Sequence, residues 1–536
     1  MGTYLNSMTA FSLYSSETKR PYFVDKTMLL TELFPLAEQG NSHICITRPR
    51  RFGKTIMANM VGAFFSKGCD SSKLFGSLKI AGQEGYQENL NQHDVIYIDF
   101  SKMPRNCTSY EQYINRIETR IMKDLIKAYP DADIETDGAV WDALDEVFAE
   151  YDSQKFIFVF DEWDYIFHRN FVTEQDKKSY ISFLRNLLKD HAYVSLTYMT
   201  GILPIAKYSS GSELNMFLEY TMVTEAKFSD YFGFAEAEVD MLYERYCANT
   251  EEPQITREKL REWYDGYHTK AGERMYNPRS VVASLTNNNL GNYWTSSGPY
   301  DEIFYYIEHN VDDVRRDLAL MAAGEAIPSK IQEYAAASMN LSTRDEIFSA
   351  MVVYGFLSYE DGKVSIPNRE LMDKFDEMIR REPSLGYVNR LAKESERMLA
   401  ATLAGDTDTM ADILAYAHNT ETPILSYNNE VELSAIVNLV YLSARDWYRI
   451  EREDKAGTGY VDFIFYPNKK ENDCIILELK IDHTPEEAIR QIREKQYALR
   501  FKGKLGEDAP YTGRILAVGI SYSRETKNHR CKIEVL

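Results

Sequence analysis

The fold of the N-terminal half is decided by one stretch, His43-Ile-Cys-Ile-Thr47-Arg48-Pro49-Arg50-Arg51-Phe52-Gly53-Lys54-Thr55. Its first five residues suit a short buried strand, and the apolar spacing that begins at Ile56 predicts an amphipathic helix. A glycine-containing loop between a strand and a helix offers backbone N–H groups and a helix N-terminus to phosphate. The sequence therefore predicts a phosphate-binding loop over residues 48–55.

The triplet at the end of this loop predicts a nucleoside triphosphate as the ligand. Lys54 is expected to reach the β and γ phosphates, and the Thr55 hydroxyl is expected to hold Mg²⁺. The standard pattern has a glycine five residues before Gly53, where this chain has Arg48. We expect the arginines of the loop to add positive potential around the phosphates, with plain surface charge as the alternative. The predicted nucleotide-binding residues are Arg48, Pro49, Arg50, Arg51, Phe52, Gly53, Lys54, Thr55 and Asp161.

A second motif fits the same chemistry. The apolar strand Phe156-Ile-Phe-Val-Phe160 ends in Asp161-Glu162. Asp161 is expected to hold Mg²⁺ through water, and Glu162 is expected to polarise the attacking water. The alternatives are a helix N-terminus without a ligand and a solvated strand end. Thr200-Gly201 ends the next strand and either senses the γ-phosphate or forms a plain turn.

The pattern around these motifs predicts an α/β fold. Four strand-like runs, at 43–47, 95–99, 156–160 and 194–200, alternate with helical patterns, which implies a parallel sheet covered by helices. Residues from about 235 to 410 read as mostly helical. Within them, Asp361-Gly362 lies between two alternating runs and predicts a hairpin that suits a winged-helix element. From about 415 the chain reads as helix, two strands, helix and a last pair of strands.

Two charged side chains interrupt an apolar strand in this last module. Glu478 and Lys480 lie two residues apart in the run 474–481 and therefore point to the same side. Charges in such a strand are costly unless they pair or bind a metal. With Asp462 on the adjoining strand, two carboxylates can hold Mg²⁺ while Lys480 orients or activates water against a phosphodiester. The alternative is a salt bridge on a solvated sheet face.

Composition excludes several classes of protein. The chain has 536 residues, of which 44% are hydrophobic and 27% charged, as in ordinary packed proteins. It has no apolar run of the ~18 residues that span a bilayer and no signal-like start, so we expect a cytoplasmic protein without a membrane partner. The six cysteines form no CxxC pair, which argues against a disulfide framework or a zinc ribbon.

The charge is distributed unevenly. The net charge of −21 would repel nucleic acid, but residues 480–536 carry 12 basic and 8 acidic side chains, leaving −25 for the rest of the chain. We expect this tail to follow a phosphate backbone, with a solvated helix as the alternative. The basic residues concerned are Arg490, Arg493, Lys495, Arg500, Lys502 and Lys504.

The first part of the chain resembles a family of bacterial AAA-ATPase-like proteins over about residues 8–290. The resemblance implies ATP as the ligand, and it implies that Asp25-Lys26-Thr27 lies near the nucleotide. It is carried by Tyr22-Phe-Val-Asp-Lys-Thr27, residues 47–55, Phe160-Asp-Glu162, Thr200-Gly-Ile-Leu-Pro-Ile-Ala206, Phe232-Gly-Phe234, Trp263-Tyr-Asp-Gly-Tyr267 and Tyr276-Asn-Pro278.

The last part, about 415–525, resembles the PD-(D/E)xK nuclease superfamily, in the version found after an AAA-ATPase-like domain. Asp462, Glu478 and Lys480 match its strand residues. The resemblance places the family's helix carboxylate on Glu430, with Glu432 two residues away as the competing position. It implies that Gln491 supports the metal site, and Tyr497 fits the same helix.

The leading interpretation is an α/β chain with a P-loop parallel sheet and flanking helices, a mainly helical middle and a restriction-endonuclease-like α/β module. We divide it into an ATPase-like domain at 1–290, a helical connector at 291–414 and a nuclease-like domain at 415–536. The expected function is ATP-controlled, Mg²⁺-dependent cleavage of nucleic acid, with DNA favoured over RNA and Mn²⁺ as an alternative ion at the nuclease site. A homo-oligomer is compatible with this, and architecture suggests defence against foreign DNA.

Two other functions are compatible with parts of the sequence. One is a nucleotide-dependent switch whose C-terminal domain binds nucleic acid or a partner without cutting it. The other is a GTPase, which is disfavoured because the only Asn-Lys stretch, Asn468-Lys-Lys-Glu471, lacks the terminal Asp.

Overall fold

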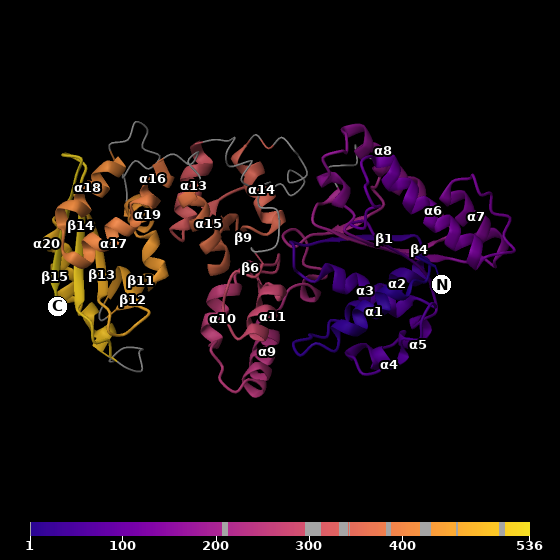
Figure 1. Cartoon of the computed structure of the whole chain (residues 1–536), viewed down its shortest axis with the longest axis horizontal. Helices are drawn as coiled ribbons and strands as arrows, with labels where there is room; N and C mark the ends of the chain where they lie inside the picture. Colours follow the sequence, from indigo (N-terminus) through magenta and orange to yellow (C-terminus); the bar gives the residue numbers. More distant parts are fainter. Residues whose placement is uncertain are drawn as a thin grey trace. The chain divides into compact units, whose positions relative to one another are not determined.

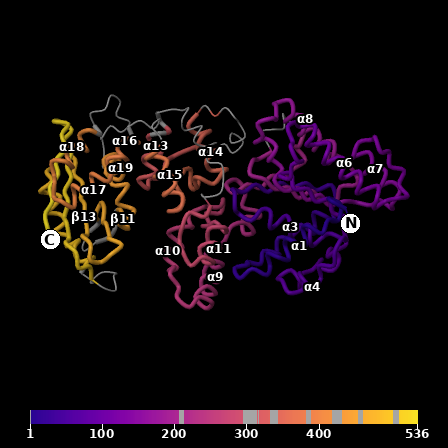
Figure 2. The backbone as a smooth tube through the Cα atoms, in the orientation of Figure 1, coloured from indigo at the N-terminus to yellow at the C-terminus, as the bar shows by residue number. Residues whose placement is uncertain are grey.

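The computed structural model describes residues 2–205, 213–294, 312–331, 341, 343–381, 387–418, 430–456, 459–502 and 510–536 (Figures 1 and 2). Contacts group the chain into two compact units. The first comprises residues 1–298 and 329–370, and the second comprises residues 299–328 and 371–536. The division of the sequence into three domains stays a prediction.

The first unit is built on a parallel five-stranded sheet of order β2-β3-β4-β1-β5. The four longer strands coincide with the four apolar runs of the sequence, so this prediction is confirmed. Because β4 lies between β1 and β3, the ends of these three strands are neighbours at one edge of the sheet. The strands are β1 (Ser42–Thr47), β2 (Asp94–Asp99), β3 (Phe156–Asp161), β4 (Val194–Gly201) and β5 (Leu218–Tyr220).

Helices cover both faces of this sheet (Figure 1). The side chains of β3 alternate between two cores: Phe156, Phe158 and Phe160 join one, and Ile157 and Val159 join the other. The first core includes α6 (Tyr110–Ala128), α7 (Val140–Glu150) and α8 (Glu174–Leu188). The second includes α1 (Met8–Glu17), α2 (Leu29–Gln39), α3 (Lys54–Phe65), α4 (Ser72–Phe75) and α5 (Tyr86–Asn89).

A helical group follows the sheet within the first unit and contains the sequence motifs between 230 and 280. Asn277 caps α11 by accepting the N–H of Ser280, and Pro278 occupies the first helical turn, which explains the Asn-Pro motif. The elements are α9 (Glu236–Asn249), α10 (Arg257–Tyr264), β6 (Tyr267–His268), β7 (Arg274–Met275) and α11 (Pro278–Asn287).

The predicted hairpin is present in the first unit. It follows α14 (Arg344–Tyr354) and pairs β9 (Ser358–Glu360) with β10 (Lys363–Ser365). Asp361 and Gly362 form its turn at φ +47° and +80°, which is the positive-φ pair that a two-residue hairpin of this kind needs. Its identity as a winged-helix element stays a prediction.

The second unit contains a mixed five-stranded sheet of order β11-β12-β13-β14-β15, in which only β13 and β14 are parallel. The strands are β11 (Tyr448–Ala456), β12 (Gly459–Pro467), β13 (Cys474–Ile481), β14 (Ile515–Ser523) and β15 (Asn528–Val535). The helices are α13 (Asp312–Ala322), α15 (Arg369–Arg381), α16 (Tyr387–Lys393), α17 (Ser395–Ala404), α18 (Thr407–His418), α19 (Glu430–Val440) and α20 (Pro485–Glu494), and the two-residue β8 is Ile327–Pro328.

Helix α20 forms the crossover between the parallel strands β13 and β14. Its start packs directly on β14, because a Cβ atom on Gly519 would lie 2.4 Å from the Pro485 carbonyl oxygen. Gly519 is the partner of Glu478 on the neighbouring strand β13. The close approach of α20 to β14 therefore also brings α20 near Glu478.

Two strands of the five-stranded sheets were not predicted. The prediction of two strands between the helices of the C-terminal module is wrong, because β11 precedes them as an edge strand. The short edge strand β5 was also missed. In the part of the chain that the structure describes, no helix is both long and apolar enough to cross a bilayer.

Candidate functional sites

The predicted phosphate-binding loop connects β1 to α3 in the first unit. Gly53 has φ +89°, a conformation that glycine adopts without strain, and the space where its Cβ would lie is open. The Lys54 ammonium is buried and donates to the carbonyl oxygens of Arg48 and Pro49, at 2.9 and 3.0 Å. Burial lowers the pKa of Lys54, and the nearby negative charge of Glu162 partly opposes this decrease. The lysine thus bonds to its own loop, and a phosphate would have to replace these hydrogen bonds.

Asp161 lies at the end of β3, beside the loop. The Thr200 hydroxyl at the end of β4 donates to Asp161 Oδ1 at 2.7 Å, and Thr55 lies near the same carboxylate and opposes the rise in its pKa. Burial, followed by the charge of Glu162, raises the pKa of Asp161 to about 6. The structure therefore brings together Thr55, Asp161 and Thr200, three oxygen-bearing side chains from three elements.

Glu162 follows with a left-handed backbone at φ +54°, which is unusual for a residue with a side chain. Burial raises its pKa, while the nearby Lys54 ammonium opposes the rise. A strained backbone at a partly buried charged residue is typical of functional sites.

Asp164 was missed by the sequence reasoning. It is 1% exposed, and its Oδ2 accepts the N–H groups of Ile202 at 3.0 Å and Leu203 at 2.8 Å. Burial raises the pKa of Asp164, and the positive charge of Lys54 opposes this rise. The acidic run from 161 to 164 directly after an apolar strand was the available signal. Asp164 ties the end of β3 to the segment after β4.

The remaining loop residues have different environments. Arg48 is 2% exposed, and its guanidinium donates to the carbonyls of Thr47 and Tyr220. These hydrogen bonds link the end of β1 to β5. Arg50 is partly exposed and Arg51 exposed, and they carry the loop's accessible charge. Pro49 and Phe52 are packing residues: Pro49 contacts Gly355, and the Phe52 ring meets Tyr267 edge-on at 5.0 Å.

A cavity of about 30 Å³ lies behind the loop, between residues 47–49 and the pair Tyr267–His268. This volume admits water but not a nucleotide.

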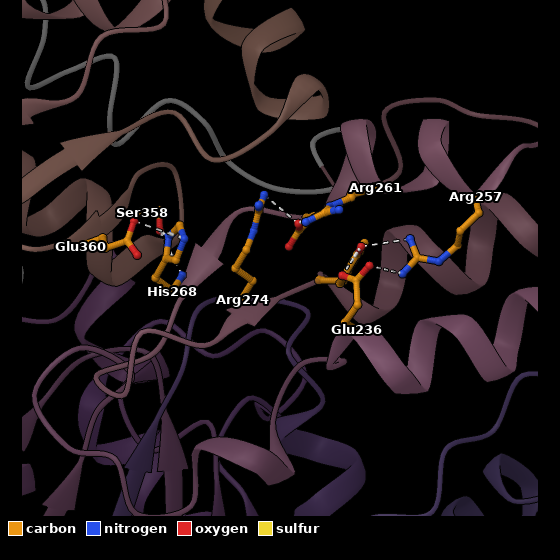
Figure 3. A network of polar contacts seen from close by, with 9 residues as sticks. Glu236, Arg257, Arg261, His268, Arg274, Ser358 and Glu360 are labelled. Carbon is orange, nitrogen blue, oxygen red and sulfur yellow. Dashed lines mark hydrogen bonds and ion pairs between the residues drawn. The ribbon is translucent and has the colours of Figure 1, made fainter. Parts of the chain in front are cut away.

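The motif from Trp263 to Tyr267 belongs to a polar network in the helical group (Figure 3). Asp265 is buried and pairs with Arg274 at 2.7 Å and Arg261 at 3.6 Å. Close by, Arg257 binds Glu236 at 2.8 Å, and the His268 ring contacts Ser358 and Glu360. This network joins α9, α10 and the β6–β7 hairpin to β9.

The motif Asp25-Lys26-Thr27 is also bonded to the helical group, through α9. Lys26 is 8% exposed and pairs with Glu238 on α9 at 2.6 Å. Asp25 Oδ1 accepts the N–H and hydroxyl of Thr27. The nearness of these residues to the nucleotide remains a prediction.

The carboxylate–lysine cluster of the second unit lies on β12 and β13. Phe463 pairs with Leu477, which makes Asp462 and Glu478 adjacent positions. Asp462 Oδ2 accepts the N–H of Leu479 at 2.7 Å. Glu478 is 3% exposed, and its Oε1 accepts hydrogen bonds from Lys480 at 3.0 Å and from the Gln491 amide. The structure therefore brings four of the predicted residues into one cluster.

The other oxygen of Glu478 has a different environment. Glu478 Oε2 is buried without a hydrogen-bond partner. Burial, then the charge of Asp462, raises the pKa of Glu478 to about 7, although Lys480 opposes the rise. Divalent cations such as Mg²⁺ bind carboxylate oxygens, so this donor set fits such an ion. The described side chains contain no group of three that could hold a metal, and two carboxylates are what this cluster offers.

The neighbouring helices contribute in part. Glu430 begins α19, but its side chain lies outside the described residues. Glu432 is buried and pairs with Arg316 on α13 at 3.1 Å, so its carboxylate already has a cationic partner. The Gln491 amide on α20 donates to Glu478 and lies near the Tyr497 hydroxyl, whose pKa it lowers.

Part of the basic tail is paired with carboxylates. Arg493 pairs with Glu534 at 2.8 Å and Arg514 with Asp473 at 2.5 Å. Lys504 and the side chain of Lys502 lie outside the described residues. The expectation that this tail follows a phosphate backbone is therefore weakened at Arg493.

Comparisons with known proteins match a stretch of the chain around each of the two candidate sites. Residues 11–210 match the family model described as predicted AAA-ATPase, and residues 432–530 match the model of the PD-(D/E)XK nuclease superfamily. The chain thus carries an AAA-ATPase-like domain followed by a nuclease-superfamily domain.

One curated relative is described as "Uncharacterized protein in vnfD 5'region" of Azotobacter chroococcum mcd 1. It is 25% identical over 282 residues, which is 52% of this chain and 51% of the relative, so the chain spans about half the relative's length. Two solved structures are similar at 12% identity: the Walker-type ATPase PABY2304 of Pyrococcus abyssi (TM-score 0.38, 65% of this chain and 94% of that one) and the ORC2 protein of Aeropyrum pernix (TM-score 0.32, 64% and 93%).

Proposed function

We propose that the chain binds and hydrolyses ATP at residues 48–55 and cleaves nucleic acid, DNA in preference to RNA, at Asp462, Glu478 and Lys480. ATP would control cleavage. Mg²⁺ serves both sites, and Mn²⁺ can replace it at the second. By analogy of architecture, the role is defence against foreign DNA.

One observation carries the nuclease half of the proposal: the buried, unpartnered Oε2 of Glu478 beside Asp462. Burying an ionised carboxylate is costly unless a charge compensates it. A simple salt bridge would be the alternative, but Lys480 bonds only to Oε1. The geometry therefore supports a cation site better than a structural ion pair.

In the nuclease site, Asp462 and Glu478 would hold the ion, which polarises the phosphodiester and makes its bound water a better nucleophile. Gln491 holds the Glu478 carboxylate in place from α20. The Lys480 ammonium is 3.0 Å from Oε1, where it can stabilise negative charge that develops on phosphate.

In the ATPase site, Lys54 would exchange its two carbonyl partners for phosphate oxygens. Thr55 and Asp161, which lie near one another, would hold Mg²⁺. Glu162 has a raised pKa and is therefore a better proton acceptor near neutral pH than an ordinary glutamate. Thr200 fixes the Asp161 oxygen from the neighbouring strand.

The test is incubation of the purified chain with plasmid, single-stranded DNA and RNA, with Mg²⁺ or Mn²⁺, and with or without ATP. We expect metal-dependent cleavage that Asp462→Asn and Glu478→Gln both abolish. Cleavage that survives Asp462→Asn would place the active site elsewhere. Binding without cleavage under every condition would favour the non-cutting switch.

A further inference from the structure

Helix α6 of the first unit carries an exposed stripe of four cations. Arg116, Arg120, Lys123 and Lys127 follow one another at steps of four, three and four residues. At 100° per residue they fall within a sector of about 60° on the helix. The opposite face, with Ile117, Ile121 and Leu125 among its residues, is buried in the core. We call these four residues the α6 stripe.

No acidic side chain shares this sector. Glu111 and Glu118 lie about 150° or more from its centre. Asp124 is closer, but it is 8% exposed and accepts the N–H groups of Tyr4 and Leu5. Like charges three and four residues apart repel one another on a helix, so the stripe is unfavourable for the isolated chain.

The stripe is also without anionic partners. Arg116 donates to the Lys102 carbonyl and Arg120 to the Thr3 hydroxyl, and both groups are neutral. Across the described residues, no carboxylate pairs with any of the four, in contrast to Arg493 and Arg514 of the second unit. The preceding loop, 100–109, adds Arg105, while its Lys102 pairs with Asp99 at 3.4 Å.

The fold leaves this surface accessible. Helix α6 follows β2, the edge strand of the sheet, and lies with α7 and α8 on one face (Figure 1). Arg120, Lys123 and Lys127 are exposed and Arg116 is partly exposed. Four basic side chains on one helix face, none of them paired with a carboxylate among the described residues, are unexpected where the first 479 residues carry −25.

We infer that the α6 stripe binds the phosphate backbone of double-stranded nucleic acid. The four cations span about 16 Å of helix, and a duplex presents about five phosphates per strand over that length. Gln112 and Thr119 flank the stripe and can donate hydrogen bonds to phosphate oxygens. This extends the proposed function, because it adds a nucleic-acid surface on the ATPase-like unit, and it does not require cleavage.

The test is duplex binding by the whole chain in EDTA, which prevents metal-dependent cutting. The stripe variant combines Arg116→Gln, Arg120→Gln, Lys123→Gln and Lys127→Gln. The control variant removes the same charge elsewhere on the first unit, through Lys19→Gln, Lys73→Gln, Lys178→Gln and Lys259→Gln, all at exposed positions. The probes are labelled 30-base-pair DNA and RNA duplexes, and the readout is fluorescence anisotropy from about 50 to 200 mM salt.

We expect the stripe variant to bind at least about 10²-fold more weakly at low salt, and its dependence on salt to fall by about 0.9 for each phosphate that it no longer neutralises. The control variant should bind almost as the parent does, and a loss of equal size in it would overturn the inference. Unchanged affinity and salt slope in the stripe variant would overturn it as well, whether or not the chain cleaves DNA. So would a stripe variant that changes only the sedimentation of the chain, because that result identifies a second copy as the partner.

Discussion

Replacing Glu478 with Gln should make the metal-free chain more stable while it abolishes cleavage. In the folded chain the pKa of Glu478 is raised from 4.5 to about 7. The folded state therefore binds this proton more tightly than the unfolded state. The stabilisation that this bound proton gives the folded chain is fully present below pH 4.5 and is lost as the pH rises through about 7.

The size of this effect follows from the shift. At about pH 8.5 the raised pKa of the side chain costs about 3 kcal/mol of stability, and at about pH 5.5 it costs about 1 kcal/mol. Gln carries no charge at either pH. Its advantage over Glu478 in the free energy of unfolding should therefore grow by about 2 kcal/mol between these two conditions.

The assay is urea unfolding of both chains in EDTA at the two pH values. Added Mn²⁺ should recover stability in the parent chain and do little for Glu478→Gln, because the ion compensates the buried charge. An advantage of Gln that is equal at both pH values would refute the reasoning, since the destabilisation would not then come from ionisation of this carboxylate.

Three further outcomes are expected. Lys54→Ala should weaken ATP binding by at least about tenfold, measured with a fluorescent ATP analogue, because the charge-assisted hydrogen bond to phosphate is removed; unchanged affinity in a folded variant would remove this loop as the nucleotide site. Glu162→Gln should bind ATP normally yet lose about 10²-fold or more in turnover by phosphate release, and turnover at the parental rate would show that another group acts on water. Lys480→Ala should slow cleavage by about 10²-fold and shift the optimum to higher pH, because Lys480 now opposes the rise in the pKa of Glu478; a pH profile without that shift would contradict the geometry.

The sequence predicted the apolar strands of the two main sheets but did not predict the edge strands β5 and β11. The runs that became β1 to β4 are apolar because both faces of the sheet are covered by helices. β11 reads Tyr-Arg-Ile-Glu-Arg-Glu-Asp-Lys-Ala, and its charged residues hide an edge strand that is held by pairing with β12. β5 has only three residues, too few for a periodic signal.

Residue types were predicted better than side-chain directions. Glu478 and Lys480 stood out because charge within an apolar strand is rare, and they do form one cluster. Arg48 was expected among the phosphates, but the structure directs its guanidinium to two backbone carbonyls. Asp164 went unnoticed because its importance depends on the N–H groups of Ile202 and Leu203, which reach it only through the fold.

Because Glu162 has a left-handed backbone, fold stability and ATPase activity favour different residues at this position. A side chain in this region costs of order 1 kcal/mol or more, which glycine would not incur. A library at this position that is sorted for thermal resistance should therefore enrich Gly and Asn, whereas sorting for ATP turnover should retain Glu. The amino acid that gives the most stable fold at this position and the amino acid that gives the highest ATP turnover would therefore be different.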